Sequence, residues 1–264
     1  QVPLALKTVQ DGKAMTDMNA MLPGVRETDI PVPDAKNSLW KLNAETIGVY
    51  RVAYSPEHLA KLGKAAAQKD SAFSLEDRVG LVSDAFTLAQ AGYSKTSGGL
   101  ALMHALRGDN SSLVNTAAAL NLGKLASVWW EQPQPVRNAI NRFRADVFGP
   151  MARELTFEFG ANDSSELREL RETVITAAAS AGDTWTIDEI RRRFAPLQEH
   201  GDYSLIHPDL LRTVLSQAVK HGGEAEYETV MGVYRAPPTP AHKTSAMVAL
   251  GTTQDAAPVS YTHL

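Results

Sequence analysis

The chain has 264 residues, of which 44% are hydrophobic and 21% are charged, and its formal net charge is −4. This composition is typical of a soluble globular protein with one large core or two smaller ones. The chain has no cysteine, which excludes disulfides and thiolate metal sites. No lysine or arginine run is long enough to favour nucleic acid, and no stretch approaches the roughly 18 apolar residues of a membrane span. We therefore expect neither partner.

The first 54 residues are predicted to form about four short strands, as a small antiparallel sheet or half of a β-sandwich. Val2 to Thr8 reads as a strand that Pro3 confines to an edge. Residues 9–22 look polar and irregular, and residues 24–30 alternate weakly. Residues 39–43 and 49–54 alternate apolar and polar side chains in steps of two, which predicts two strands joined by a turn over 44–48. Ser55 and Pro56 then favour the start of a helix.

From Ser74 onward the sequence predicts helices. Ser74 can cap a helix whose apolar positions Leu75, Val79, Val82 and Phe86 recur at +4, +7 and +11. Further apolar periods predict helices over 97–106, 112–130, 135–157, 164–181, 187–200, 208–221, 225–234 and 240–250. Paired helices without intervening strands favour a mostly α fold, an α-solenoid of the HEAT or armadillo kind. No strict sequence period is visible.

Two local signals refine these helices. Gly149 and Pro150 interrupt an apolar stripe whose phase continues beyond them, which predicts a kinked helix or two abutting helices. Thr186 followed by Glu189 matches a capping box and predicts a helix start there.

Catalytic motifs are absent from the sequence. No His-Glu-x-x-His pair, nucleophile elbow or phosphate loop occurs. His200 and His207 lack a third ligand, so we interpret them as surface or capping residues. Residues 191–193, three arginines, are interpreted as a solvated helix face, with a small anionic contact site as the alternative. Asp77, Arg78 and Asp84 are expected to form ion pairs with neighbours.

Trp129 and Trp130 are adjacent, so at 100° per residue at least one points away from the helix face of Leu122 and Leu125. A rim or cavity-lining role is one interpretation, and packing between helices is the other.

Several motifs resemble one protein family in the same order. They are Trp40-Lys-Leu-Asn, Gly48-Val-Tyr-Arg-Val-x-Tyr, Asp77-Arg-Val-Gly-Leu-Val-Ser-Asp-Ala-Phe, Asp146-Val-Phe-Gly-Pro, Glu189-Ile-Arg-Arg-Arg-Phe and Ala249-Leu-Gly-Thr. Together they resemble the zinc aminopeptidases with a His-Glu-x-x-His motif, in particular the puromycin-sensitive and cytosolic fungal branch.

The resemblance implies a region without catalytic residues. In this family a β-sandwich links a zinc-bearing catalytic domain to a helical bowl that closes over the active site. Residues 1–54 would be part of that sandwich, 55–73 a connecting helix and linker, and 74–258 a truncated helical domain. Zinc, its ligands and the peptide substrates would then belong to a cytoplasmic parent enzyme whose catalytic domain is missing here. No catalytic residue or metal ligand is assigned to any position, and Trp129 and Trp130 are the candidate contacts with the peptide chamber.

Both ends of the chain suggest a fragment. Gln1 is not an initiator methionine, and residues 259–264 match one reading frame of a widely used sequencing-transposon end, so we interpret them as an artefact. The alternative to an aminopeptidase region is a stand-alone α-solenoid scaffold that binds proteins and has no enzymatic activity.

Overall fold

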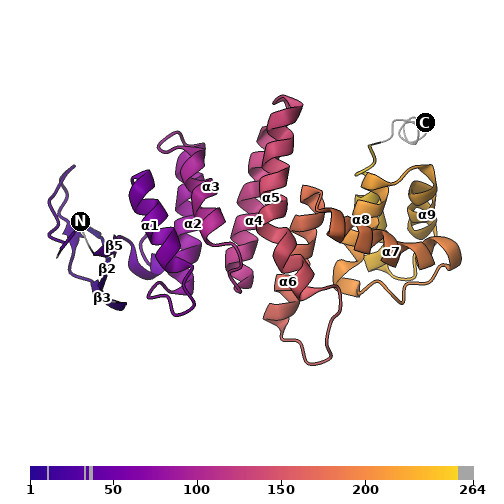
Figure 1. Ribbon diagram of the computed structural model, residues 1–264, viewed down its shortest axis with the longest axis horizontal. Coiled ribbons are helices and arrows are strands. Elements are labelled where there is room, and N and C mark those ends of the chain that lie inside the picture. Colours follow the sequence, from indigo (N-terminus) through magenta and orange to yellow (C-terminus); the bar gives the residue numbers. More distant parts are fainter. Residues whose placement is uncertain (11, 33, 36–37, 255–264) are drawn as a thin grey trace. The chain divides into compact units, whose positions relative to one another are not determined.

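The computed structural model describes residues 1–10, 12–32, 34–35 and 38–254, and the chain divides into two compact units (Figure 1). The first unit is Gln1–Lys124 and the second is Leu125–Leu264. The predicted division into a β-sandwich part, a linker and a helical part was based on the type of secondary structure and not on compactness. It stays a prediction. The interpretation of residues 259–264 as an artefact lies outside the described residues.

The strands described in the first unit form two small antiparallel sheets. β1 (Val2–Pro3) pairs with β4 (Met21–Leu22), and the second sheet has the order β3 (Lys13–Asp17), β2 (Leu6–Gln10), β5 (Leu39–Lys41). Both sheets contribute to one apolar core. Leu4, Leu6 and Ala20 are buried in it, and Leu22 and Trp40 pack against them. Antiparallel strands before a mostly helical chain were predicted, and that prediction is confirmed.

Three of the predictions for the first 54 residues were wrong. Residues 24–30, counted among the predicted strands, form no strand. Residues 9–22 contain β3 and β4, although β3 has no apolar alternation because every one of its side chains is exposed at the edge of the sheet. Residues 49–54 form no strand. Side chains bind this backbone where a neighbouring strand would, since Asn43 donates to the carbonyls of Gly48 and Tyr50 at 3.1 and 3.2 Å, and the Val52 amide donates to Asp84 at 3.0 Å.

The rest of the first unit is helical. A 3-10 turn, η1 (Ala44–Thr46), is followed by α1 (Pro56–Ala66), α2 (Leu75–Gln90), α3 (Thr96–Ala105) and α4 (Ser112–Val128), whose last turn belongs to the second unit. Ser55 and Ser74 cap α1 and α2 as predicted, each accepting from a backbone amide at 3.2 Å. The helices pack through large buried side chains, among them Leu62, Leu81, Val82, Leu102 and Met103.

The second unit consists of α5 (Gln134–Leu155), α6 (Ser165–Ala181), α7 (Thr184–His200), α8 (Leu211–His221), α9 (Glu224–Arg235) and α10 (Pro240–Leu250), with a 3-10 turn, η2 (Pro208–Leu210), before α8. α5 runs as one helix through Pro150, so the predicted alternative of two abutting helices was wrong, and the predicted kink stays a prediction. α7 starts earlier than the Thr186 signal indicated, because Asp183 is the residue that caps it, accepting from the Thr186 amide at 3.0 Å.

No helix within the described residues is both long enough and apolar enough to cross a membrane. The mostly α fold class with preceding antiparallel strands is thus the architecture that the structure shows.

Candidate functional site

The two tryptophans singled out from the sequence follow directly after α4. The Trp129 amide donates to the Leu125 carbonyl at 3.1 Å and the Trp130 amide to Ser127 at 3.3 Å, so both indoles are carried on a further turn of backbone. Trp129 is half-buried, whereas the Trp130 side chain is 66% exposed. An exposed indole offers a large flat surface for contact with another molecule. The assignment of this pair to a peptide chamber stays a prediction.

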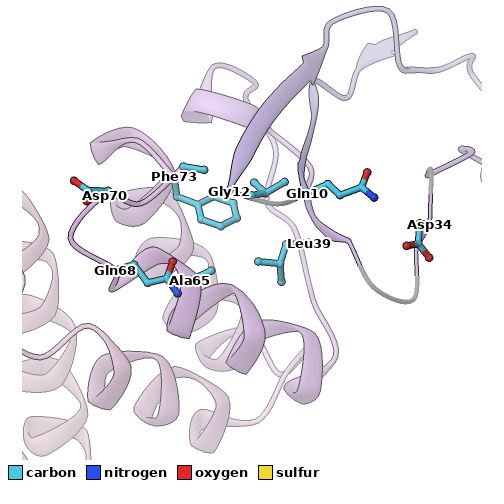
Figure 2. A pocket seen from close by; sticks show the side chains of 10 residues that line it. Gln10, Gly12, Asp34, Leu39, Ala65, Gln68, Asp70 and Phe73 are labelled. Atoms are coloured by element: carbon cyan, nitrogen blue, oxygen red, sulfur yellow. The ribbon is translucent and has the colours of Figure 1, made fainter.

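A cavity of about 330 Å³ lies in the first unit, between the three-stranded sheet and the end of α1 (Figure 2). Its lining residues are Val9, Gln10, Gly12, Asp34, Leu39, Ala65, Gln68, Asp70, Ala72 and Phe73. Figure 2 shows Phe73 and Leu39 toward the middle of the group and Asp34 and Asp70 at opposite sides. The lining has no histidine, arginine or hydroxyl group. Its apolar middle could receive an apolar or amide group, and the two carboxylates of the lining, Asp34 and Asp70, are too far apart in the group to act as a pair.

The histidines near the end of α7 have capping and surface positions. His207 precedes η2 and accepts from the Asp209 amide at 3.2 Å, and its ring stacks on Phe159 with centroids 3.7 Å apart. Burial, together with the charges of Arg168 and Arg171, lowers the pKa of His207 against the opposing effect of Asp209. His200 is exposed at the end of α7. The interpretation of both as surface or capping residues is confirmed.

A buried polar network of the first unit surrounds Asp77, whose side chain is fully buried at the start of α2. Asp77 forms ion pairs with Lys7 from β2 and with Lys41 from β5, the second at 2.9 Å. It also accepts from the Glu45 amide at 2.8 Å and completes the capping box with Ser74. One carboxylate therefore ties the sheet, the η1 turn and α2 together.

The register of the sheet explains why this carboxylate is needed. Lys7 and Lys41 lie directly opposite each other on adjacent strands, and each is only 3% exposed. Like charges at such positions repel each other unless a counter-charge lies between them. Burial alone would lower the pKa of Lys7, but its bonds to Asp77 and Glu45 outweigh burial and raise it. Burial likewise opposes ionisation of Asp77, but the two lysines outweigh it and lower the pKa of Asp77.

Two further charged residues of α2, Arg78 and Asp84, are also paired. Arg78 forms an ion pair with the buried Asp109, and Asp84 binds Arg51 at 3.0 Å. The prediction that Asp77, Arg78 and Asp84 form ion pairs is confirmed. Sequence reasoning did not identify their partners, because those lie up to 70 positions away and carry no local signal.

The three arginines 191–193 behave differently from one another. Arg191 and Arg192 are exposed and pair with Asp188 and Glu189 on their own helix, at 3.3 and 2.9 Å. Arg193 is 5% exposed, which corrects its place on a solvated face. It pairs with Glu158, donates to the Leu205 carbonyl at 3.0 Å and covers the Phe157 ring. The loop between α5 and α6 supplies two of these partners, so Arg193 fixes that loop.

Arg171 of α6 fixes the same loop from the other side. It binds Asp163 at 2.6 Å and the Leu155 carbonyl at 3.0 Å, and its guanidinium covers the Phe159 ring at 4.6 Å. Within the described residues no group of three or more histidine, aspartate or glutamate side chains lies close enough to hold a metal ion. The charged clusters described so far thus connect elements of the fold.

Comparison with known proteins gives a consistent result. A family model described as the ERAP1-like C-terminal domain matches residues 39–261. The chain is 30% identical over 226 residues to Aminopeptidase 2 of Candida albicans, covering 86% of this chain and 24% of that protein. It is 31% identical over 217 residues to the alanine/arginine aminopeptidase of Saccharomyces cerevisiae, with coverage of 82% and 25%. It is 26% identical over 236 residues to the puromycin-sensitive aminopeptidase of Caenorhabditis elegans, with coverage of 88% and 24%.

The chain therefore spans about a quarter of the length of the curated relatives that it matches.

Proposed function

This chain belongs to the ERAP1-like C-terminal domain family, and on that premise we propose that it is the non-catalytic C-terminal region of a zinc aminopeptidase. Its helices would close over an active site held elsewhere in the parent protein and help to form a chamber for peptide substrates. The family match over residues 39–261 carries this proposal. We place the parent in the cytoplasm on the resemblance to the cytosolic branch alone.

Zinc does not fit the residues that are described here. No cluster of three candidate ligands occurs in the described part of the chain, and a catalytic zinc needs three protein ligands and an open position for water. The proposal therefore assigns zinc to the catalytic domain of the parent and derives no step through it for this chain. This chain would supply a rigid surface that lines the chamber. The Asp77 network would hold the sheet and α2 together, and Arg171 and Arg193 would hold the loop between α5 and α6 in place.

Activity of the chain alone tests the first half of the proposal. We expect no hydrolysis of aminoacyl-amide substrates when zinc is added to the purified chain. Turnover that a chelator abolishes would show that the chain carries its own active site. A parent reading frame without a His-Glu-x-x-His helix upstream would favour the non-enzymatic scaffold instead.

A substitution of Trp130 tests whether its exposed indole contacts peptides in the chamber. Replacing Trp130 by serine in the parent enzyme should raise KM for peptides of about ten residues roughly 5- to 10-fold, the loss typical of an aromatic contact worth 1 kcal/mol or more. KM for single aminoacyl-amides should rise much less, because they do not reach across a chamber. Met247→Ser is the matched control, since Met247 is another large apolar side chain that is 56% exposed in the second unit. Equal KM changes for both substrate sizes, or none, would remove Trp130 from the chamber.

A further inference from the structure

The cavity of Figure 2 lies within the first unit, between two walls that hydrogen bonds hold in place. One wall belongs to the sheet, where Val9 of β2 lies directly opposite Leu39 of β5. The other belongs to the end of α1 and the turn after it. In that turn the Ser71 hydroxyl donates to the Ala65 carbonyl at 2.9 Å and accepts from the Phe73 amide at 3.1 Å. The cavity is therefore formed before any ligand binds, as small-molecule sites usually are.

Apolar side chains line the middle of the cavity. Phe73 is 2% exposed and Val9 is 8% exposed, and Figure 2 shows Phe73 and Leu39 between the polar residues of the lining. The volume of about 330 Å³ is at the lower end of the range for small-molecule sites. A ligand that fits should therefore be small, with an apolar centre that shields these side chains from water.

Each end of the cavity combines a carboxylate with a primary amide. Figure 2 shows Asp70 and Gln68, which follow α1, on one side of the apolar middle, and Asp34 and Gln10 on the other. The Asp34 carbonyl accepts from the Ser38 amide at 2.8 Å, which holds the backbone of the second end. Among the lining residues that the structure describes there is no lysine, arginine or histidine. Both ends thus offer oxygen acceptors and negative charge to a cation.

We propose that this cavity binds a linear aliphatic diamine, a dication with one ammonium group at each end of a short alkyl chain. One ammonium would lie between Asp70 and Gln68. The other would lie between Asp34 and Gln10, because an ammonium carries three donors and a compact positive charge. The alkyl chain would cover Phe73. The proposal concerns the first unit alone and does not depend on the proposed peptidase function.

Titration of the full chain with cadaverine, a five-carbon diamine, tests the site when the NMR signals of the amine are followed at fixed pH and ionic strength. Butylamine is the matching monocation, and we expect it to bind about 3- to 5-fold more weakly, the contribution of a second, partly exposed charge pair. Asp70→Asn and Asp34→Asn should each weaken the binding of cadaverine by the same factor. Asp29→Asn is the matched control, because Asp29 is an exposed acid of the same unit outside the cavity lining, and it should bind cadaverine like wild type.

A variant with a smaller cavity separates this site from a general attraction between charges. Ala65→Leu adds bulk to the lining and keeps both carboxylates and both amides, so it should abolish the binding of cadaverine. Unchanged affinity in Ala65→Leu or in Asp70→Asn would overturn the proposal. Equal affinity for cadaverine and butylamine would do so too, because a single ammonium, such as that of a lysine side chain, would then suffice. No binding of cadaverine to the wild-type chain up to about 50 mM overturns it whether or not the variants fold.

Discussion

Replacing Asp77 by asparagine should greatly destabilise the first unit. The substitution keeps the shape of the side chain but removes the one charge that both Lys7 and Lys41 share, and it leaves two ammonium groups that are each 3% exposed. Removing one partner of a buried ion pair costs about 3 to 5 kcal/mol. Glu45 can still pair with Lys7, but its side chain is 43% exposed and its contribution is correspondingly small. We therefore expect a loss within that range.

Hydrogen exchange can measure the loss of stability in the first unit separately. A single unfolding curve cannot do so, because it combines the unfolding of both units. Amides of α2 and β2 that exchange by unfolding of the unit should exchange about two to three and a half orders of magnitude faster in Asp77→Asn, since each 1.4 kcal/mol is a factor of ten. Arg51→Gln is the control, because it breaks the partly exposed pair with Asp84 in the same unit and should cost at most about 1 kcal/mol.

A double variant gives the sharpest check of the reasoning. Asp77→Asn combined with Lys7→Met removes one of the two buried lysines that have lost the Asp77 charge, so it should be more stable than Asp77→Asn alone. If Asp77→Asn costs no more than Arg51→Gln, or if adding Lys7→Met destabilises the chain further, the network is not held by charge compensation.

Two other changes test separate features of the fold. Gly80→Ala should lower the free energy of unfolding by about 1 to 3 kcal/mol, because an added Cβ on α2 would lie 2.2 Å from the Thr46 hydroxyl of η1. Chemical denaturation measures this loss, and a stability equal to that of the wild-type chain would show that Thr46 can move away at no cost. The lowered pKa of His207 means that the unfolded chain takes up a proton first, so the free energy of unfolding should fall as pH drops below about 6.5. His207→Asn keeps a capping side chain and should reduce that slope between pH 7.5 and 5.5, and an unchanged slope would contradict the assignment.

Helices were the most predictable part of this chain because their signals are local. Apolar spacing and capping residues such as Ser74 lie within a few positions of the structure that they specify. The strands were less predictable. β3 is exposed at every position and gives no alternation, and residues 49–54 alternate like a strand although side chains of Asn43 and Asp84 bind part of their backbone instead. Periodicity indicates which side chains can be buried, but not which backbone lies beside them.

For charged residues, too, the sequence indicated burial but not the partner. An aspartate inside the apolar pattern of α2 predicted an ion pair at Asp77, but its partners on two strands depend on the register of a sheet that the sequence does not display. Arg144 carried a similar signal, since it interrupts the apolar stripe of α5. A single charge within an apolar stripe predicts a buried group, and only the structure shows whether a partner is present.

Three buried arginines of the second unit can be compared by whether a carboxylate partner is present. Arg171 and Arg193 are as buried as Arg144, and each has a carboxylate partner and an aromatic ring against its guanidinium, whereas the partner found for Arg144 among the described residues is the Asn141 amide oxygen. Removing an uncompensated buried charge removes a desolvation cost, so Arg144→Met should raise the free energy of unfolding, whereas Arg171→Met should lower it. Chemical denaturation of the wild-type chain and the two variants measures these opposite shifts, and a large loss of stability for Arg144→Met would show that Arg144 is already compensated within the fold.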